Sequence, residues 1–317
     1  MKAVFALLIM MMNFSIAEAA IYGTDDRKDI GEILTLKPEA SAVAITIANN
    51  FLKEVNANYF RVDDVQTFAT SSNMCSSERF ITQPVFDIGT CTGFLVSDRY
   101  LVTAGHCVLP NGIINDQKHA FCDAFSWYFG FNTATQTQTT NQIIRKDQVY
   151  RCKRVVRAEN IVGGADFAVM ELERPVRVAN SNLLLKPLSL RTEPPVLGEK
   201  VFSIGHPFGL PAKFSGLSQI TSLSAENFFE VNLDSAGGNS GSPVFDSRRQ
   251  VVGILIEGHP VDTYVPANLN CNRINRCNDL ASKCLANSSF PGLSTSNHIQ
   301  KLTPALKYLP TATDHAF

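Results

Sequence analysis

The strongest constraint on the fold is the length of the apolar runs, most of which are short and bounded by glycine, proline, asparagine or aspartate. Short runs of this kind, separated by frequent turns, are typical of strands in an all-β barrel or sandwich. The sequence therefore predicts an all-β fold. The expected strands include Ala42–Ile47, Thr92–Val96, Tyr100–Val102, Phe167–Leu172, Lys200–Ile204 and Val251–Ile256.

Helical periodicity occurs in only two places, Ile47–Val55 and the tail around Ile299–Tyr308. The first competes with the end of an expected strand, and the second predicts a short C-terminal helix. Residues 133–142 are polar and repetitive, which indicates a long exposed hairpin or loop between Cys122 and Cys152. Residues 173–195 lack patterning and predict a connector between two halves of the chain.

The N-terminus has the layout of a secretory signal peptide. Lys2 precedes a run of nine apolar residues, Val4–Met12, and the small-residue site Ala17-Glu18-Ala19 follows. Cleavage after Ala19 gives a signal peptide over residues 1–19. The apolar run is too short for a membrane span, which needs about 20 residues. The chain is therefore expected to be secreted, to the periplasm or the extracellular medium, with no membrane span.

Removing 19 of the 317 residues leaves 298, enough for one large or two medium domains. The 28 basic and 29 acidic side chains nearly cancel, which gives no support for nucleic acid or an anionic membrane as a partner. The expected partners are protein or peptide substrates, and the expected state is a monomer without a cofactor.

Eight cysteines in an exported chain predict four disulfides. A metal site is the competing interpretation, mainly for Cys271, Cys277 and Cys284. The gaps between these three are wider than the two to four residues usual for zinc ligands. We therefore expect no metal. Cys75 is expected to pair with one of these three, and the remaining two with each other.

Three polar residues stand in local contexts that suit nucleophilic catalysis. His106 follows a sharp Ala-Gly turn between Cys91 and Cys107, which would tie the flanking strands together. Closing a loop of that size stabilises a fold by about 3 kcal/mol and would fix the imidazole. Asp166 begins an apolar strand and either caps a turn or orients a histidine, holding its proton on Nδ1.

Ser240 lies in the stretch DSAGGNSGSPVF, residues 234–245, among small residues. Such a cluster is commonly a tight turn, but it also lets backbone amides face a substrate. The chain order His106, Asp166, Ser240 excludes an α/β-hydrolase, whose order is Ser, Asp, His. Position 242 is also serine where that fold's elbow requires glycine.

Together these motifs resemble the chymotrypsin-fold serine peptidases, and most of all the bacterial secreted glutamyl endopeptidases. The resemblance rests on TAGHC (103–107), ADFAV (165–169) and GGNSGSPVF (237–245), and it covers about residues 91–258. It implies two Greek-key six-stranded β-barrels with the active site between them. Residues 20–185 would form the N-terminal segment and first barrel, and residues 186–317 the second barrel and tail.

The resemblance also assigns roles. Ser240 is the nucleophile, His106 its base, and Asp166 the group that steadies the imidazolium. The N–H groups of Gly238 and Ser240 form the oxyanion hole. Cys91–Cys107 corresponds to the family's histidine-loop disulfide, and we also expect Cys122–Cys152.

Substrate preference is read from the position six before the nucleophile, which lies at the base of the family's primary pocket. Asp234 stands there, followed by Ser235, and a buried carboxylate favours basic substrate residues. Gly258 would form an open wall. Residues 253–258 lack the histidine of the glutamyl-specific members, which argues against preference for glutamate. Alternatively, Asp234 pairs with the α-amine of Ala20 and is neutralised.

Two other interpretations stay open. Residues 204–209 (IGHPFG) resemble a loop of the high-temperature-requirement proteases, although no C-terminal peptide-binding domain follows. A non-catalytic peptidase homologue would use the same cleft to bind or adhere to other proteins. Asn239 replaces the aspartate with which trypsin-like enzymes pair a new N-terminus, so that activation switch is not expected here.

Overall fold

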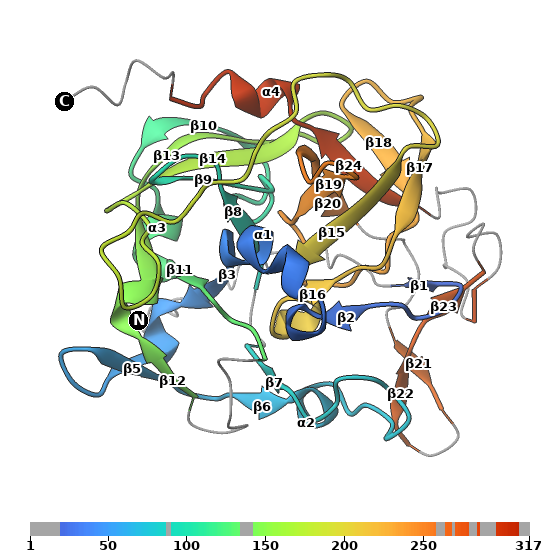
Figure 1. Cartoon of the computed structure of the whole chain (residues 1–317), viewed down its shortest axis with the longest axis horizontal. Coiled ribbons are helices and arrows are strands. Elements are labelled where there is room, and N and C mark those ends of the chain that lie inside the picture. Colours follow the sequence, from blue (N-terminus) through green and yellow to red (C-terminus); the bar gives the residue numbers. More distant parts are fainter. Residues whose placement is uncertain are drawn as a thin grey trace, which may run out of the picture.

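The short apolar runs form the strands of two closed, six-stranded antiparallel barrels (Figure 1). The computed structural model describes residues 20–86, 90–133, 142–257, 264–267, 270–278, 284–285 and 296–310. All six runs named above coincide with barrel strands to within one residue at each end, so the all-β prediction is confirmed. The expected signal peptide and most of the segment 133–142 lie outside the described residues.

The first barrel is built from β3 (Val43–Ala48), β8 (Thr92–Leu95), β9 (Tyr100–Thr103), β11 (Phe125–Phe129), β13 (Val149–Asn160) and β14 (Asp166–Leu172). Around the ring the order is β3-β8-β9-β14-β13-β11, and pairing of β11 with β3 closes it. The interior is packed by large side chains such as Leu95, Leu101, Trp127 and Met170, all fully buried.

The second barrel is built from β15 (Lys200–Gly205), β17 (Ser218–Ser222), β18 (Phe228–Val231), β19 (Pro243–Asp246), β20 (Val251–Glu257) and β24 (Asn297–Lys301). Its ring order is β15-β17-β18-β24-β20-β19, closed by the pairing of β15 with β19. When the six strands of each barrel are numbered in the order in which they occur along the chain, both barrels have the same strand order around the ring. The molecule is therefore a structural repeat, although the sequence shows none.

Smaller elements surround the barrels. The strands are β1 (Ile21–Tyr22), β2 (Lys28–Asp29), β4 (Leu52–Glu54), β5 (Tyr59–Val62), β6 (Gln66–Thr67), β7 (Pro84–Val85), β10 (Gly112–Gln117), β12 (Gln142–Arg145), β16 (Lys213–Phe214), β21 (Tyr264–Pro266), β22 (Asn272–Ile274) and β23 (Arg276–Cys277). The α-helices are α1 (Lys37–Ser41), α2 (Phe68–Ser71), α3 (Ala120–Ala124) and α4 (Thr303–Leu306). None of the helices in the described ranges is long and apolar enough to cross a membrane.

The two helical predictions have different outcomes. The C-terminal helix is confirmed as α4, but only after Asn297–Lys301 has completed the second barrel as a strand. The competing helix at Ile47–Val55 is wrong. Here β3 runs to Ala48, a 3₁₀ turn follows, and β4 begins at Leu52. Ile45 and Ile47 are buried outside the barrel by a satellite cluster, which gives an apolar run without strand alternation.

Four disulfides link the described cysteines: Cys75–Cys271, Cys91–Cys107, Cys122–Cys152 and Cys277–Cys284. Both expected pairings in the first barrel are present, and Cys75 joins one of the three C-terminal cysteines as predicted. The division at residues 185 and 186 remains a prediction. It falls in the connector between the end of β14 and the start of β15.

Candidate active site

The side chains of His106 and Asp166 are in direct contact. His106 lies in the turn after β9, and Asp166 is the first residue of β14. The Oδ2 atom of Asp166 lies 2.7 Å from Nδ1 of His106, and its Oδ1 accepts the His106 backbone N–H at 2.9 Å. Both side chains are more than four-fifths buried. A carboxylate bound this way holds the imidazole proton on Nδ1 and leaves Nε2 as the base.

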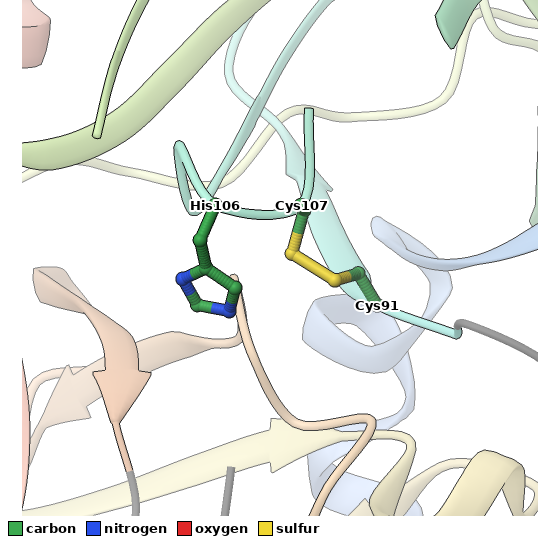
Figure 2. A group of neighbouring side chains, drawn as sticks. All are labelled: Cys91, His106 and Cys107. Carbon is green, nitrogen blue, oxygen red and sulfur yellow. A yellow bond between two sulfur atoms is a disulfide. The ribbon is translucent and has the colours of Figure 1, made fainter. Parts of the chain in front are cut away.

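The Cys91–Cys107 disulfide lies against the imidazole, as Figure 2 shows. A ring nitrogen of His106 and the two sulfur atoms lie within 4.8 Å of one another. Such a group could suggest a metal site, but both sulfur atoms are in the disulfide and offer no thiolate ligand. The disulfide instead restricts the turn that carries His106.

Ser240 comes from the second barrel, three residues before β19, and meets the first barrel at this turn. Its carbonyl oxygen accepts the backbone N–H of Thr92 at 2.8 Å and lies 3.7 Å from Sγ of Cys107. Ser240 is 4 % exposed. The three candidate residues therefore converge from β9, β14 and the segment before β19 on the interface between the barrels.

The backbone amides around Ser240 divide into two groups. The N–H groups of Asn239, Gly241 and Ser242 donate to the carbonyls of Ala236, Leu255 and Asn239. Within the part of the chain that the structure describes, the N–H groups of Gly238 and Ser240 donate to no protein acceptor. Backbone N–H groups without a protein acceptor are left to bond with water or with a ligand. Two such amides, that of the serine itself and that of the residue two positions before it, suit a developing oxyanion.

Comparison with known proteins bears on this geometry. A family model of the trypsin-like peptidase domain matches residues 91–254, more than half of the 317-residue chain. The chain belongs to the trypsin-like serine peptidase family. The matched range contains all three candidate residues. No curated protein matches the chain.

Solved structures that resemble this trypsin-like peptidase are distant in sequence. A Glu endopeptidase in complex with MPD is 17% identical over 91% of this chain and 97% of its own, with a TM-score of 0.48. A serine endoprotease from Yersinia pestis is 14% identical over 86% of this chain and 62% of its own, with a TM-score of 0.41. The Rv3671c Ser343Ala mutant from M. tuberculosis is 12% identical over 91% of this chain and 94% of its own, with a TM-score of 0.44.

Asp234 and Ser235 are buried beneath the N-terminal segment of this peptidase. Asp234 is 4 % exposed, and its Oδ1 accepts the Tyr22 N–H at 2.8 Å. Its Oδ2 has no hydrogen-bond partner among the residues that the structure describes. Burial raises the pKa of Asp234 to about 8 against the opposing hydrogen bond from Tyr22. The Ser235 N–H donates to the Ala20 carbonyl. Gly258, the expected pocket wall, lies outside the described residues.

Two positioning residues have no signal in the sequence. Thr92 donates its hydroxyl to the Gly238 carbonyl at 2.7 Å, in addition to its backbone bond to Ser240. Gln300, fully buried on β24, accepts the Asp166 backbone N–H at 2.8 Å. Both bonds connect one barrel to the other. The residues involved are more than 130 positions apart, so only the closed fold brings them together.

Proposed function

We propose that this trypsin-like peptidase is a serine endopeptidase in which Ser240, His106 and Asp166 form the catalytic triad. The observation that carries the proposal is the pair of unsatisfied amides at Gly238 and Ser240. The Ser240 carbonyl is in turn bonded to β8, the strand next to the one that leads into the His106 turn. The short contact between Nδ1 of His106 and Oδ2 of Asp166 supports the same assignment.

The chemistry follows from these positions. Nε2 of His106 removes the proton of the Ser240 hydroxyl as its oxygen attacks the scissile carbonyl. The amides of Gly238 and Ser240 stabilise the negative oxygen, a contribution of about 2.7–4 kcal/mol per donor. His106 then protonates the leaving amine, and water hydrolyses the acyl-enzyme by the reverse proton path. The chain's own residues supply every proton transfer, so we propose no cofactor.

We propose cleavage after basic residues as the preference of this site. Support comes from the Oδ2 atom of Asp234, a buried oxygen without a hydrogen-bond partner in the described part of the chain. A guanidinium or ammonium group would satisfy it through a charge-assisted hydrogen bond. The α-amine of Ala20 could do the same, because the Ala20 carbonyl already bonds to Ser235. In that case the pocket would be neutral and the preference for basic residues would be lost.

Export is part of the proposal. Four disulfides support an oxidising compartment outside the cytoplasm, periplasmic or extracellular. The signal peptide over residues 1–19 and the monomeric state stay predictions. N-terminal sequencing of the exported protein tests the first, with Ala20 as the expected first residue. Sedimentation analysis tests the second.

The test of activity is fluorophosphonate labelling of the purified protein, with Ser240→Ala as the control. Labelling of the wild type alone, followed by cleavage of a peptide library, supports a serine endopeptidase. Comparing peptides with Arg, Lys, Glu or Phe before the scissile bond then ranks the preference. Absence of labelling in the wild type contradicts the proposal. A non-catalytic homologue that binds other proteins would then be the better interpretation.

A further inference from the structure

The turn at residues 206–209 contains a strained residue next to the candidate oxyanion hole. Phe208 has φ +57 and ψ +16, which lies in the left-handed region that residues other than glycine rarely adopt. A bulky residue keeps such a conformation only where its surroundings hold it there, and such residues cluster at functional sites.

The strained turn directs the Phe208 N–H at the Gly237–Gly238 peptide, which carries one donor of the candidate oxyanion hole. This N–H donates to the Gly237 carbonyl oxygen at 2.5 Å. In a planar trans peptide the carbonyl and the next N–H point in opposite directions. Because the Gly237 carbonyl points into the 206–209 turn, the Gly238 N–H points away from it. A rotated peptide would present a carbonyl oxygen there, which repels an oxyanion.

Gly238 is fitted closely to the same turn. Its φ is +95, and an added Cβ would lie 2.4 Å from the His206 carbonyl oxygen and 3.2 Å from the Phe208 nitrogen. On its other side, the Gly238 carbonyl accepts the Thr92 hydroxyl at 2.7 Å. The Gly237–Gly238 peptide is therefore held at one end by Phe208 and at the other by Thr92.

The ring of Phe208 is anchored outside both barrels. Its centroid lies 4.8 Å from that of Phe68, which is fully buried on α2, and 5.8 Å from that of Tyr264 on β21. In Figure 1, α2 lies beside the β21–β22 hairpin at the lower edge of the molecule. The Tyr264 hydroxyl contacts the Ser72 hydroxyl at 2.9 Å, and Cys75–Cys271 ties the two segments covalently.

We infer that Phe208 is a positioning residue for peptide hydrolysis: its ring, held on Phe68 and Tyr264, keeps its N–H on the Gly237 carbonyl and so keeps the Gly238 N–H turned toward the substrate. The inference rests on the proposed function. It predicts that removal of the ring weakens stabilisation of the transition state without weakening substrate binding. The effect is expected in kcat, because the oxyanion forms only during the reaction.

The test compares Phe208→Gly with Phe80→Gly. Phe80 is a matched control because it is also a partly buried phenylalanine of the same apolar cluster and also has a positive φ, +64. Its carbonyl accepts the Gln83 N–H, a bond unrelated to Gly237. In both variants glycine adopts the left-handed backbone freely, so the substitution removes the aromatic side chain without straining the backbone. Phe208→Tyr retains the ring.

We expect kcat for the preferred peptide to fall about 10- to 100-fold in Phe208→Gly, approaching the loss of one oxyanion donor, with KM changed less than about threefold. Affinity for a peptide boronate, which forms an anionic tetrahedral adduct on Ser240, should fall in parallel. Phe80→Gly should keep kcat within about twofold, and Phe208→Tyr should restore most of it. Equal losses in the two glycine variants, or an unchanged kcat in Phe208→Gly, would overturn the inference.

Amide hydrogen exchange gives a readout that does not depend on catalysis. The Phe208 amide should be protected in the wild type, and the amide at position 208 should exchange at least tenfold faster in Phe208→Gly. If the wild type is not labelled by fluorophosphonate, the proposed function fails while the exchange result still decides whether the ring holds this bond. If the protection at position 208 is unchanged, the inference is wrong even in an active enzyme.

Discussion

Replacing Asp234 by asparagine should stabilise the substrate-free protein at neutral pH. The folded-state pKa of this carboxyl is raised to about 8 from a normal value of 3.8, mainly because the side chain is buried. A group with a raised folded pKa contributes its full stability below its unfolded pKa, and loses it as pH rises through the folded pKa. Asp234 therefore destabilises the fold progressively between about pH 4 and pH 8.

The magnitude follows from the width of this interval. Each pKa unit corresponds to about 1.4 kcal/mol, so the three units from pH 4 to pH 7 give a loss on the order of 4 kcal/mol. Asparagine has nearly the same shape, can accept the Tyr22 N–H through its own Oδ1, and carries no charge. An amide N–H left without an acceptor would offset about 1–3 kcal/mol of the gain. We expect a net stabilisation at pH 7 that disappears near pH 4.

Urea unfolding of the wild type and Asp234→Asn at pH 4.5, 5.5, 6.5 and 7.5 measures this difference, and other titrations cancel in the comparison. Asp64→Asn, at an exposed aspartate, is the matched control and should show no pH-dependent difference. A variant that is less stable than the wild type at pH 7 would refute the reasoning, since Asp234 would then be ionised and paired. Repeating the measurement with one residue added before Ala20 would show whether the Ala20 α-amine is that partner.

Three further predictions concern the site and its surroundings. Asp166→Asn should lower kcat about 10⁴-fold with little change in unfolding, because the wrong imidazole tautomer is stabilised; steady-state kinetics beside thermal unfolding checks this. Gly241→Ala should destabilise the fold by more than about 2 kcal/mol, since φ is +87 and a Cβ would lie 2.1 Å from the Thr92 carbonyl oxygen; a urea midpoint like the wild type's would contradict it. Burial lowers the pKa of His206 to about 3, so the neutral imidazole stabilises the fold above pH 6.5 and this stability is lost as pH falls toward 3; His206→Gln should remove that acid sensitivity in unfolding scans from pH 7 to 4.

Local sequence was sufficient for the elements whose cause is local. The short runs at Thr92–Val96 and Tyr100–Val102 are strands because a tight turn separates two apolar segments. The Cys91–Cys107 pairing was also accessible, since these two strands are adjacent in the chain. The Ile47–Val55 segment misled because β3 is buried on both faces, so neither helical nor strand periodicity is distinct there.

The environment of Asp234 depends on contacts across the whole chain and was therefore not predictable in detail. Its position before Ser240 indicated a pocket, but not that Tyr22 would bond to it across 212 residues of sequence. The same holds for the Gln300 side chain, which accepts the Asp166 N–H from the other barrel. Such contacts depend on which strand ends are adjacent after both barrels have closed, and the local sequence pattern does not predict which ends these are.

The small residues around Ser240 have one common cause in the structure. Gly238 lies against the His206 carbonyl and Gly241 against the Thr92 carbonyl, each too closely for a Cβ. Ser242, fully buried, donates its N–H to the Asn239 carbonyl. His206 belongs to the second barrel and Thr92 to the first, so this segment is compressed between the two. The candidate oxyanion hole is thus part of the barrel interface. A substitution that shifts one barrel against the other should therefore reduce kcat before it measurably reduces substrate binding.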